Sequence, residues 1–279
     1  MKIAVIGGGS TYTPELITGF LARINELPLN ELWLMDIDEN RLNIVGGSAQ
    51  RMVESHGSPF KVFLSNDQAE SIRGASYVIT QLRVGQMHAR REDEYLGFRH
   101  NLIGQETTGI GGMAKALRTI PVMLNIASDM GNLAPDALLV NFTNPSGLIT
   151  QALTMAAPQV SVVGVCNVAI GVKMRILESL QKKNGEKIDP SIAELDTLGL
   201  NHLTWHRGFK LNGQQIWPQI IEEYIAELKS AESPEFPPEL IETLQMIPSY
   251  YLNYYYDTAH KLDEQKKWPP SPPSRTSCM

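Results

Sequence analysis

A glycine run at the start of the chain is the feature that most restricts its fold. Gly7-Gly8-Gly9-Ser10 follows the apolar segment Lys2–Ile6 and precedes a predicted helix, Pro14–Arg23. Glycines between a strand and a helix let the backbone approach a pyrophosphate, and the helix N-terminus offers it free N–H groups. The first and third of these glycines fit the G-x-G-x-x-G pattern, although Tyr12 stands at its last position. The chain is therefore expected to begin with a dinucleotide-binding strand, turn and helix.

An acidic residue downstream supports this interpretation. Asp36 ends the predicted strand Leu32–Asp36. A carboxylate at this place accepts both hydroxyls of an adenine ribose and disfavours a 2′-phosphate, so NAD is favoured over NADP. The alternative is a glycine turn without a ligand and a surface aspartate. The predicted cofactor-binding residues are Gly7, Gly8, Gly9, Ser10, Thr11 and Asp36.

Short β-rich runs alternate with amphipathic stretches over the first part of the chain, which is the pattern of a parallel α/β sheet. The predicted strands are Lys2–Ile6, Leu32–Asp36, Lys61–Leu64, Tyr77–Leu82, Leu138–Phe142 and Val160–Val165. The predicted helices between them are Pro14–Arg23, Arg41–Ser55, Ile120–Met130 and Leu148–Ala156. The rhythm then changes to a long helix from Ala169 to Lys183, a strand at Leu195–Leu200, and helix-rich sequence with scattered prolines.

The predicted fold class is α/β: a Rossmann-type parallel sheet, like that of lactate and malate dehydrogenases, followed by an incomplete α+β substrate domain. The expected domains are an NAD-binding domain over residues 1–168, a partial substrate and oligomerisation domain over 169–265, and a disordered tail over 266–279. The tail is rich in proline and serine and cannot continue a core. We interpret it as the off-pattern ending of an interrupted reading frame rather than a natural linker.

Composition excludes several classes of protein. The formal net charge is -6 and no basic stripe is present, which argues against nucleic acid as a partner. No apolar run approaches the roughly 18–20 residues of a membrane span, so no membrane association is expected. The only two cysteines, Cys166 and Cys278, make a disulfide framework improbable. The predicted location is a reducing cytoplasm.

Three polar segments follow apolar runs: 141–145 (NFTNP), 164–168 (GVCNV) and 199–202 (GLNH). The carboxyl ends of strands line the ligand crevice of an open α/β sheet. Cys166 and His202 can each ligate a divalent metal, although two ligands leave a site that a bound diol and water would have to complete. The alternatives are that Cys166 is a small buried apolar residue and His202 a hydrogen-bonded core residue.

Two further clusters carry potential chemistry. The aromatic run Tyr250–Tyr256 is typical of a packing surface, and a tyrosine acts as a base only where its surroundings lower its pKa. Arg83, Arg90 and Arg91 follow a predicted strand and could bind an anion. Since acidic residues 92–94 adjoin them, they could equally form a solvated salt-bridge network.

Taken together, these segments resemble glycoside hydrolase family 4, an NAD-dependent exception to hydrolysis by two carboxylates. The matching segments are residues 6–10 (IGGGS), 13–15 (TPE), 36–38 (DID), 103–107 (IGQET), 141–145 (NFTNP), 164–168 (GVCNV) and 199–202 (GLNH). Their order and spread cover most of the first 256 residues. The Cys-Asn-Val form is similar to the 6-phospho-β-glucosidase branch, from which Ala169 departs, since that branch usually has proline there.

The resemblance implies hydrolysis of a phosphorylated disaccharide or an aryl β-glucoside 6-phosphate with NAD and Mn2+ or another divalent metal. Hydride leaves C3 for NAD, a tyrosine removes the C2 proton, the aglycone leaves C1, water adds, and hydride returns. The residues implied are Tyr251 as the base, Cys166 and His202 as metal ligands, Asn144 and Asn167 for sugar hydroxyls, and Arg90 for the 6-phosphate. The general acid is unassigned, with Glu106 as the candidate.

Family members continue past the tyrosine run, so the chain is expected to be a truncated member that lacks part of the substrate pocket. The full-length family is expected to form homo-oligomers. Two alternatives stay open. A 2-hydroxy-acid-type dehydrogenase would produce NADH stoichiometrically without a metal. A truncated protein without catalytic activity would bind NAD and not turn over.

Overall fold

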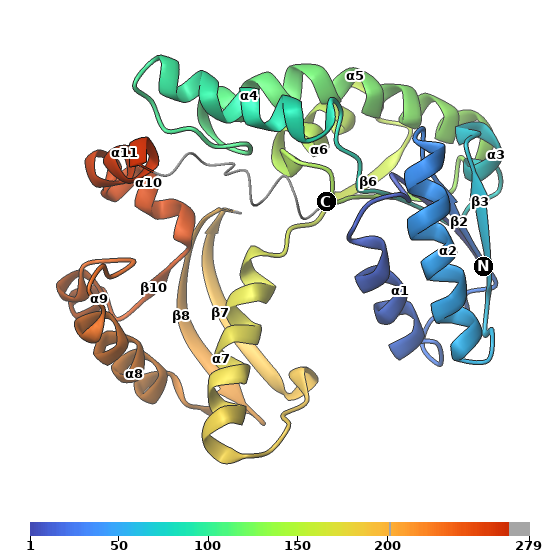
Figure 1. Ribbon diagram of the computed structural model, residues 1–279. Helices are drawn as coiled ribbons and strands as arrows, with labels where there is room; N and C mark the ends of the chain where they lie inside the picture. Colours follow the sequence, from blue (N-terminus) through green and yellow to red (C-terminus); the bar gives the residue numbers. More distant parts are fainter. Residues whose placement is uncertain (201, 268–279) are drawn as a thin grey trace. The chain divides into compact units, whose positions relative to one another are not determined.

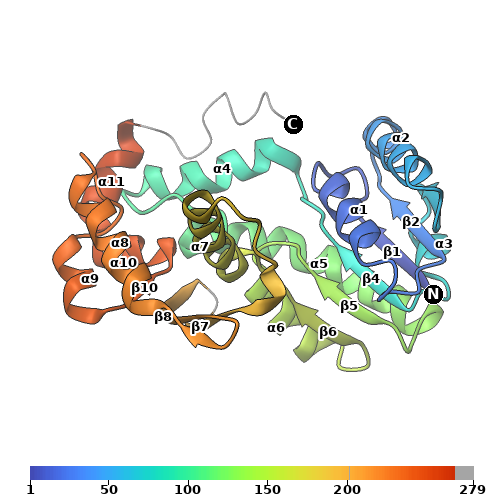
Figure 2. The same ribbon diagram turned by 90° about the horizontal axis from the view of Figure 1, so that it is seen from below.

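The structure, a computed structural model, describes residues 1–200 and 202–267 (Figure 1 and Figure 2). These residues form two compact units, one of residues 1–165 with 265–267 and the other of Cys166–Glu264. Within the described ranges, no helix is long and apolar enough to cross a membrane.

The first unit is built on a six-stranded sheet in which every neighbouring pair of strands is parallel. Across the sheet the strands are β3 (Lys61–Ser65), β2 (Glu31–Met35), β1 (Lys2–Ile6), β4 (Tyr77–Thr80), β5 (Leu138–Asn141) and β6 (Ser161–Gly164). This 3-2-1-4-5-6 order is that of the Rossmann fold, whose direction of winding reverses between β1 and β4. All six predicted strands are confirmed: β1 has the predicted bounds, and the ends of the other five are shifted by one or two residues.

Helices cover both faces of this sheet (Figure 1). Strand β1 shows why, because Ile3 and Val5 point into one core while Ala4 and Ile6 point into the other. Strands buried on both faces are expected where crossover helices pack above and below. On the first face lie α1 (Thr13–Ala22) and α2 (Glu39–Ser55). On the second lie α3 (Gln68–Ile72), α5 (Gly109–Leu133) and α6 (Ser146–Ala156).

The sequence prediction misses helix α4 (Gln86–Arg99) and the first part of α5. Helix α4 has no apolar stripe, because its buried positions are occupied by Asp93, Glu94 and Gly97. Three glycines open α5, and glycine is a poor helix former. Close packing of α4 against α5 overrides these local preferences.

The second unit is an antiparallel sheet packed with helices. Its strands are β7 (Ala193–Leu200), β8 (Leu203–Leu211), β9 (Gln214–Gln215) and β10 (Ile247–Pro248), with β8 between β7 and β10. Its helices are α7 (Val168–Asn184), η1 (Pro190–Ile192), α8 (Trp217–Ser230), α9 (Pro238–Leu244), η2 (Tyr250–Leu252) and α10 (Asn253–Tyr256), and α11 (Thr258–Lys267) follows. Phe209, Phe236 and Ile241 are among the most buried residues of its core. The predicted combination of a parallel Rossmann-type sheet with an α+β part is confirmed.

The sequence prediction misses one part of this region. The sequence after Leu200 is predicted to be helix-rich, which agrees with the helices from Trp217 on, but β8 and β9 precede them and were not predicted. The cause is that the buried face of β8 carries Thr204 and His206, so polarity does not alternate as in an ordinary half-buried strand. Of the predicted disordered tail 266–279, residues 266 and 267 end helix α11, and the rest lies outside the described residues.

Two helical glycines give a matched test of the α4–α5 packing. A Cβ at Gly111 would meet the carbonyl oxygens of Gln105 and Asp93, whereas a Cβ at Gly19 in α1 meets nothing within 4 Å. We predict that Gly111→Ala lowers the free energy of unfolding by about 1–3 kcal/mol through overpacking. Gly19→Ala should raise it by about 0.5–1 kcal/mol through helix propensity. Urea denaturation measures both, and equal effects would contradict the close approach of α4 and α5.

Candidate active site

The predicted cofactor turn is held tightly against β2. The N–H groups of Gly7 and Gly8 both donate to the Met35 carbonyl oxygen, at 2.9 and 2.7 Å. Gly7 adopts a positive φ of 94°, which favours glycine. A Cβ at Gly8 would lie 2.8 Å from the Leu34 Cβ. The turn therefore requires glycine for its own conformation, and it delivers the chain directly into helix α1.

Asp36 lies beside this turn, as the sequence predicts. Its Oδ2 accepts from the Gly9 N–H at 2.9 Å and its Oδ1 from the Asp38 N–H at 3.0 Å. Each carboxylate oxygen has a second lone pair, so both can still accept a ribose hydroxyl. Ser10 is half-buried and Thr11 is exposed at the same turn. The arrangement fits the amino end of a helix that receives a pyrophosphate.

The sequence analysis does not single out Arg41, which adjoins this turn. Its Nη2 donates to the Gly9 carbonyl oxygen at 3.3 Å, from the first turn of α2. Its position five residues after Asp36 is the signal that could have pointed to it. Arg41 ties the glycine turn to α2 and places a positive charge next to Asp36.

The loop after β5 carries Asn144, whose peptide bond to Pro145 is cis. Asn141, buried at the end of β5, shapes this loop: its Oδ1 accepts from the Thr80 hydroxyl at 3.1 Å and from the Thr143 N–H at 3.0 Å. The half-buried Asn144 side chain makes no hydrogen bond within the described part of the chain. Asn144 thus stands at the carboxyl edge of the sheet, on a loop anchored by its neighbours.

A cluster of buried charges lies where β4, α4 and α5 meet, and Glu106 is its centre. The Glu106 carboxylate contacts Arg83 Nη1 at 2.6 Å, Lys115 Nζ at 2.9 Å and Arg90 Nη1 at 3.5 Å. Arg90 also pairs with Glu94 at 2.9 Å. Arg90 is therefore a fixed guanidinium in a mostly buried network, and the expected alternative of a solvated network does not describe it.

The charge state of Glu106 bears on its role as a candidate general acid. Burial by itself raises the pKa of this carboxyl, but the nearby charges of Lys115, Arg83 and Arg90 outweigh burial and lower the pKa to about 2. A general acid must hold a proton at the working pH. In this arrangement Glu106 is ionised near neutral pH, so it is an ion-pairing residue rather than a proton donor.

Lys115 also belongs to the Glu106 cluster, and the sequence analysis does not identify it. Its side chain is 3% exposed, and burial lowers its pKa, an effect that Glu106 partly offsets. A lysine within the mostly apolar sequence of α5 is the feature that could have identified Lys115 as a buried charge. Arg118, on the same helix, forms a two-pronged pair with Asp93 of α4, at 3.1 and 2.6 Å. These pairs join α4 to α5 through charge rather than through apolar packing.

In the second unit the structure brings three predicted residues together. The Cys166 sulfur lies 3.5 Å from His202 Nε2. The His202 and Tyr251 rings stack, with centroids 3.7 Å apart and planes inclined by 2°. Burial lowers the pKa of His202, which favours the neutral imidazole that a metal requires. Asn167, also predicted, is exposed at the start of α7, one residue after Cys166.

The Cys166–His202 pair has the separation of two ligands on one ion. With metal–sulfur and metal–nitrogen bonds of about 2.3 and 2.1 Å and a tetrahedral angle, the two ligand atoms would lie about 3.6 Å apart. Among the described residues no group of three or more His, Cys, Asp or Glu side chains could hold a metal. The two donors fit a divalent ion whose remaining positions would be filled by oxygen atoms from outside this set.

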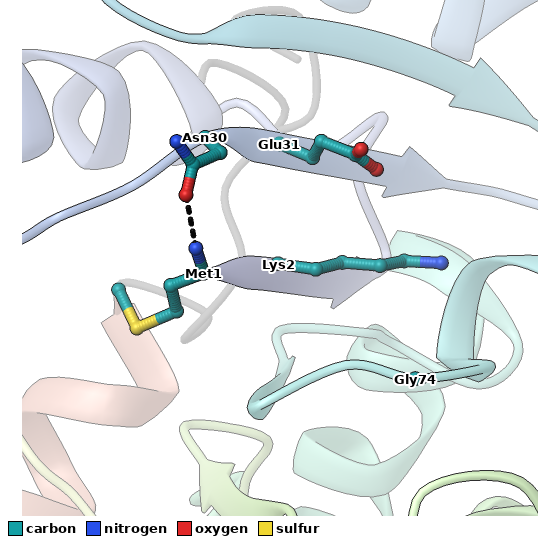
Figure 3. Close-up of a pocket in the computed structure, with 5 residues that line it drawn as sticks. All are labelled: Met1, Lys2, Asn30, Glu31 and Gly74. Carbon is teal, nitrogen blue, oxygen red and sulfur yellow. Dashed lines mark hydrogen bonds between the residues drawn. The ribbon is translucent and has the colours of Figure 1, made fainter.

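A separate hollow of about 430 Å3 lies at Met1, Lys2, Asn30, Glu31 and Gly74. Figure 3 shows the Met1 amino group hydrogen-bonded to the Asn30 side chain, at the starts of β1 and β2. Ligands of open α/β sheets bind at the opposite, carboxyl ends of the strands. The hollow contains none of the predicted site residues, and we assign it no part in the chemistry.

Comparison with known proteins links these features to one family. A model of the Family 4 glycosyl hydrolase matches residues 2–182, and one of the Family 4 glycosyl hydrolase C-terminal domain matches residues 197–274. The probable 6-phospho-beta-glucosidase of Bacillus subtilis (strain 168) is 43% identical over 272 residues. That alignment covers 95% of this chain and 60% of the relative, so the chain spans about three fifths of the relative's length.

Solved structures agree with this relationship. The 6-phospho-beta glucosidase from Thermotoga maritima, solved with manganese, NAD+ and glucose-6-phosphate, has a TM-score of 0.85 and 32% sequence identity, covering 96% of this chain and 62% of that chain. Malate dehydrogenase from Salinibacter ruber has a TM-score of 0.57 and 14% identity, covering 96% and 75% of the two chains. At that identity the second likeness shows a shared fold alone.

The Glu106 cluster predicts a specific pH dependence of stability. Because the folded pKa of Glu106 lies below its ordinary value of 4.5, its ionised form stabilises the fold above about pH 4.5, and this contribution is lost as the pH falls toward 2. We predict that Glu106→Gln costs on the order of 3–5 kcal/mol at pH 7, where Lys115 loses its counter-charge. The difference between wild type and variant should shrink below pH 4.5, by at most about 3 kcal/mol.

Urea denaturation of both proteins between pH 7 and pH 3.5 measures this difference. The control is Glu26→Gln, which removes an exposed partner of Arg23 and should change stability by less than about 1 kcal/mol at every pH. A Glu106→Gln difference that stays constant over this range would contradict the assigned charge state.

Proposed function

Since the chain belongs to family 4 of the glycosyl hydrolases, we propose that it contributes to the NAD- and metal-dependent hydrolysis of 6-phospho-β-glucosides. The observation that carries the proposal is the arrangement of Cys166 and His202 at ligand separation with Tyr251 stacked on His202. The relative solved with manganese, NAD+ and glucose-6-phosphate supports the same set of ligands. The proposed substrates are phosphorylated disaccharides and aryl β-glucoside 6-phosphates.

The proposed role of the first unit is to bind the cofactor. The glycine turn presents backbone N–H groups at the start of α1 to a pyrophosphate, with Gly7, Gly8 and Gly9 allowing the close approach and Ser10 and Thr11 flanking it. Asp36 accepts the ribose hydroxyls through the lone pairs that its two backbone bonds leave free. Bound NAD supplies hydride transfer at C3 of the sugar, which makes the neighbouring C2 proton acidic.

In the second unit, Cys166 and His202 hold the divalent ion, which acts there as a Lewis acid on the sugar oxygens. Tyr251 removes the proton from C2. Its stacking on the buried His202 ring keeps the phenol next to the proposed metal ligands. Asn144 and Asn167 orient sugar hydroxyls.

Arg90 is proposed to bind the 6-phosphate. Glu94 and Glu106 hold its guanidinium in place, so the side chain loses little conformational freedom when an anion arrives. Three cations, Arg83, Arg90 and Lys115, surround the Glu106 carboxylate, and this positive charge favours binding of an anion beside Arg90.

The proposed setting is the cytoplasm, where Cys166 stays reduced and available as a ligand. Assembly into a homo-oligomer is part of the same proposal for the whole protein.

The test is release of p-nitrophenol from its β-glucoside 6-phosphate by purified protein under reducing conditions. We expect turnover only when NAD and Mn2+ are both present, with NAD acting catalytically. Cys166→Ala should lower the rate by on the order of 100-fold or more, since even outer residues of metal sites cost 10–100-fold. NADH accumulating stoichiometrically without a metal would favour a dehydrogenase. NAD binding without turnover under every condition would favour a non-catalytic chain.

The role of Tyr251 is tested by Tyr251→Phe, which keeps the ring that stacks on His202 and removes the hydroxyl. We predict a loss of about 10²–10⁴-fold in the exchange of the substrate C2 proton with D2O, because the general base is gone. NAD affinity should stay unchanged, as measured by fluorescence titration. Tyr254→Phe, in the same aromatic run, is the matched control. Undiminished C2 exchange in Tyr251→Phe would remove this residue from the mechanism.

A further inference from the structure

Five buried polar side-chain atoms in the second unit have no hydrogen-bond partner within the part of the chain that the structure describes. The atoms are Thr204 Oγ1, His206 Nε2, Ser249 Oγ, and both Oδ1 and Nδ2 of Asn253. His206, Ser249 and Asn253 are 0% exposed and Thr204 is 5% exposed. A buried polar atom without a partner costs about 1–3 kcal/mol, so five such atoms together call for an occupant.

The sheet register places three of these side chains, those of Thr204, His206 and Ser249, on one face. Thr204 and His206 are two residues apart on β8, and both are buried on the same side of the strand. Strand β10 pairs Ile247 with His206, and the Ser249 N–H donates to the Thr204 carbonyl oxygen at 2.8 Å. Ser249 therefore continues the pairing opposite Thr204, and side chains directly opposite in an antiparallel pair lie on the same face.

The same face leads to the candidate metal pair. His202 precedes Thr204 by two residues, in the turn before β8, and is buried as well. Asn253 is the first residue of α10 and follows Tyr251 by two residues. The turn η2, which carries Tyr251 and directly precedes Asn253, is in contact with β8.

The chemistry of these atoms identifies the occupant. Asn253 Nδ2 only donates and Asn253 Oδ1 only accepts, whereas the Thr204 and Ser249 hydroxyls do both. His206 binds the Thr197 hydroxyl through Nδ1 at 2.9 Å, which leaves Nε2 as a single donor or acceptor. An anion would need donors and a cation would need acceptors. A mixed, uncharged set suits water, which makes two to four hydrogen bonds in such places.

The charged groups nearby are consistent with a neutral occupant. Burial lowers the pKa of His206, and the positive charge of Arg175 on α7 lowers it further, so the imidazole is neutral near pH 7. The carboxyl of Glu235 also interacts with Arg175. Burial raises the pKa of this carboxyl, and the charge of Arg175 partly offsets the rise.

We propose that the second unit contains an internal water site, bounded by Thr204, His206, Ser249 and Asn253, in which ordered water molecules link β8 to the turn that carries Tyr251. The site is distinct from the Cys166–His202 pair, and its existence does not depend on the catalytic proposal.

A crystal structure of the wild-type protein at a resolution that shows ordered solvent is the direct test. We expect water molecules that each lie within hydrogen-bond distance of at least two of the five atoms. Empty density, or direct bonds among the four side chains, would overturn the proposal. A bromide soak separates water from an anion, because an anomalous peak at this place would assign the site to an anion instead.

Matched variants test the site in solution. Thr204→Val and Ser249→Ala keep the side-chain shape or shrink it slightly and remove one hydroxyl. If water bonds these hydroxyls, each variant should lower the melting temperature by about 2–4 °C, whereas removal of an unpartnered hydroxyl would raise it. Thr204→Ser, which keeps the hydroxyl, should lie closer to wild type than Thr204→Val. The double variant should lose less than the sum of the single losses, because both hydroxyls share the same water.

Asn253→Leu gives the largest contrast, since it removes two of the five atoms at similar volume. We expect a lower melting temperature together with faster hydrogen exchange of the backbone amides in η2 and α10. A rise in melting temperature in both Asn253→Leu and Thr204→Val would overturn the proposal, because it would show that the side chains face a dry core.

Discussion

The ion cluster centred on Glu106 holds together the segment after β4, helix α4 and helix α5 of the first unit. One carboxylate attracts three cations that come from the end of β4, from α4 and from α5. Burying charges costs several kcal/mol per ion, and the cost is offset only when each ion has close, well-placed partners. Here every member has them, and the same is true of the Asp93–Arg118 pair. Helix α4, which lacks an apolar stripe, keeps its place because of these contacts.

Much of the first unit could be predicted from sequence because its signals are local. Short apolar runs mark strands such as β1 and β2, and the glycine turn with Asp36 marks the predicted cofactor edge. The resemblance to family 4 is confirmed by the family models. Helix α4 could not be predicted in this way, because its buried residues are acidic and their partners, such as Arg118, lie far along the chain.

The candidate site shows the same limit. Motif order predicts Cys166, His202 and Tyr251, and these residues are found together, although their chemical roles stay a prediction. No sequence pattern reveals that Tyr251 stacks on His202, because the pairing of β8 with β10 creates that contact. Strand β8 was not predicted because its buried face carries the polar side chains of Thr204 and His206, where apolar side chains are usual.

The bond between Gly9 and Asp36 has a consequence for how cofactor preference can evolve or be engineered. In the usual redesign from NAD to NADP, the acidic residue at the end of the second strand is exchanged for a small or basic one. Here that exchange would also remove the acceptor for two backbone N–H groups, those of Gly9 and Asp38. With the role proposed here for Asp36, selectivity and loop geometry would be inherited together. A switch of cofactor would then begin with residues that rebuild the turn, and Arg41 is already in contact with it.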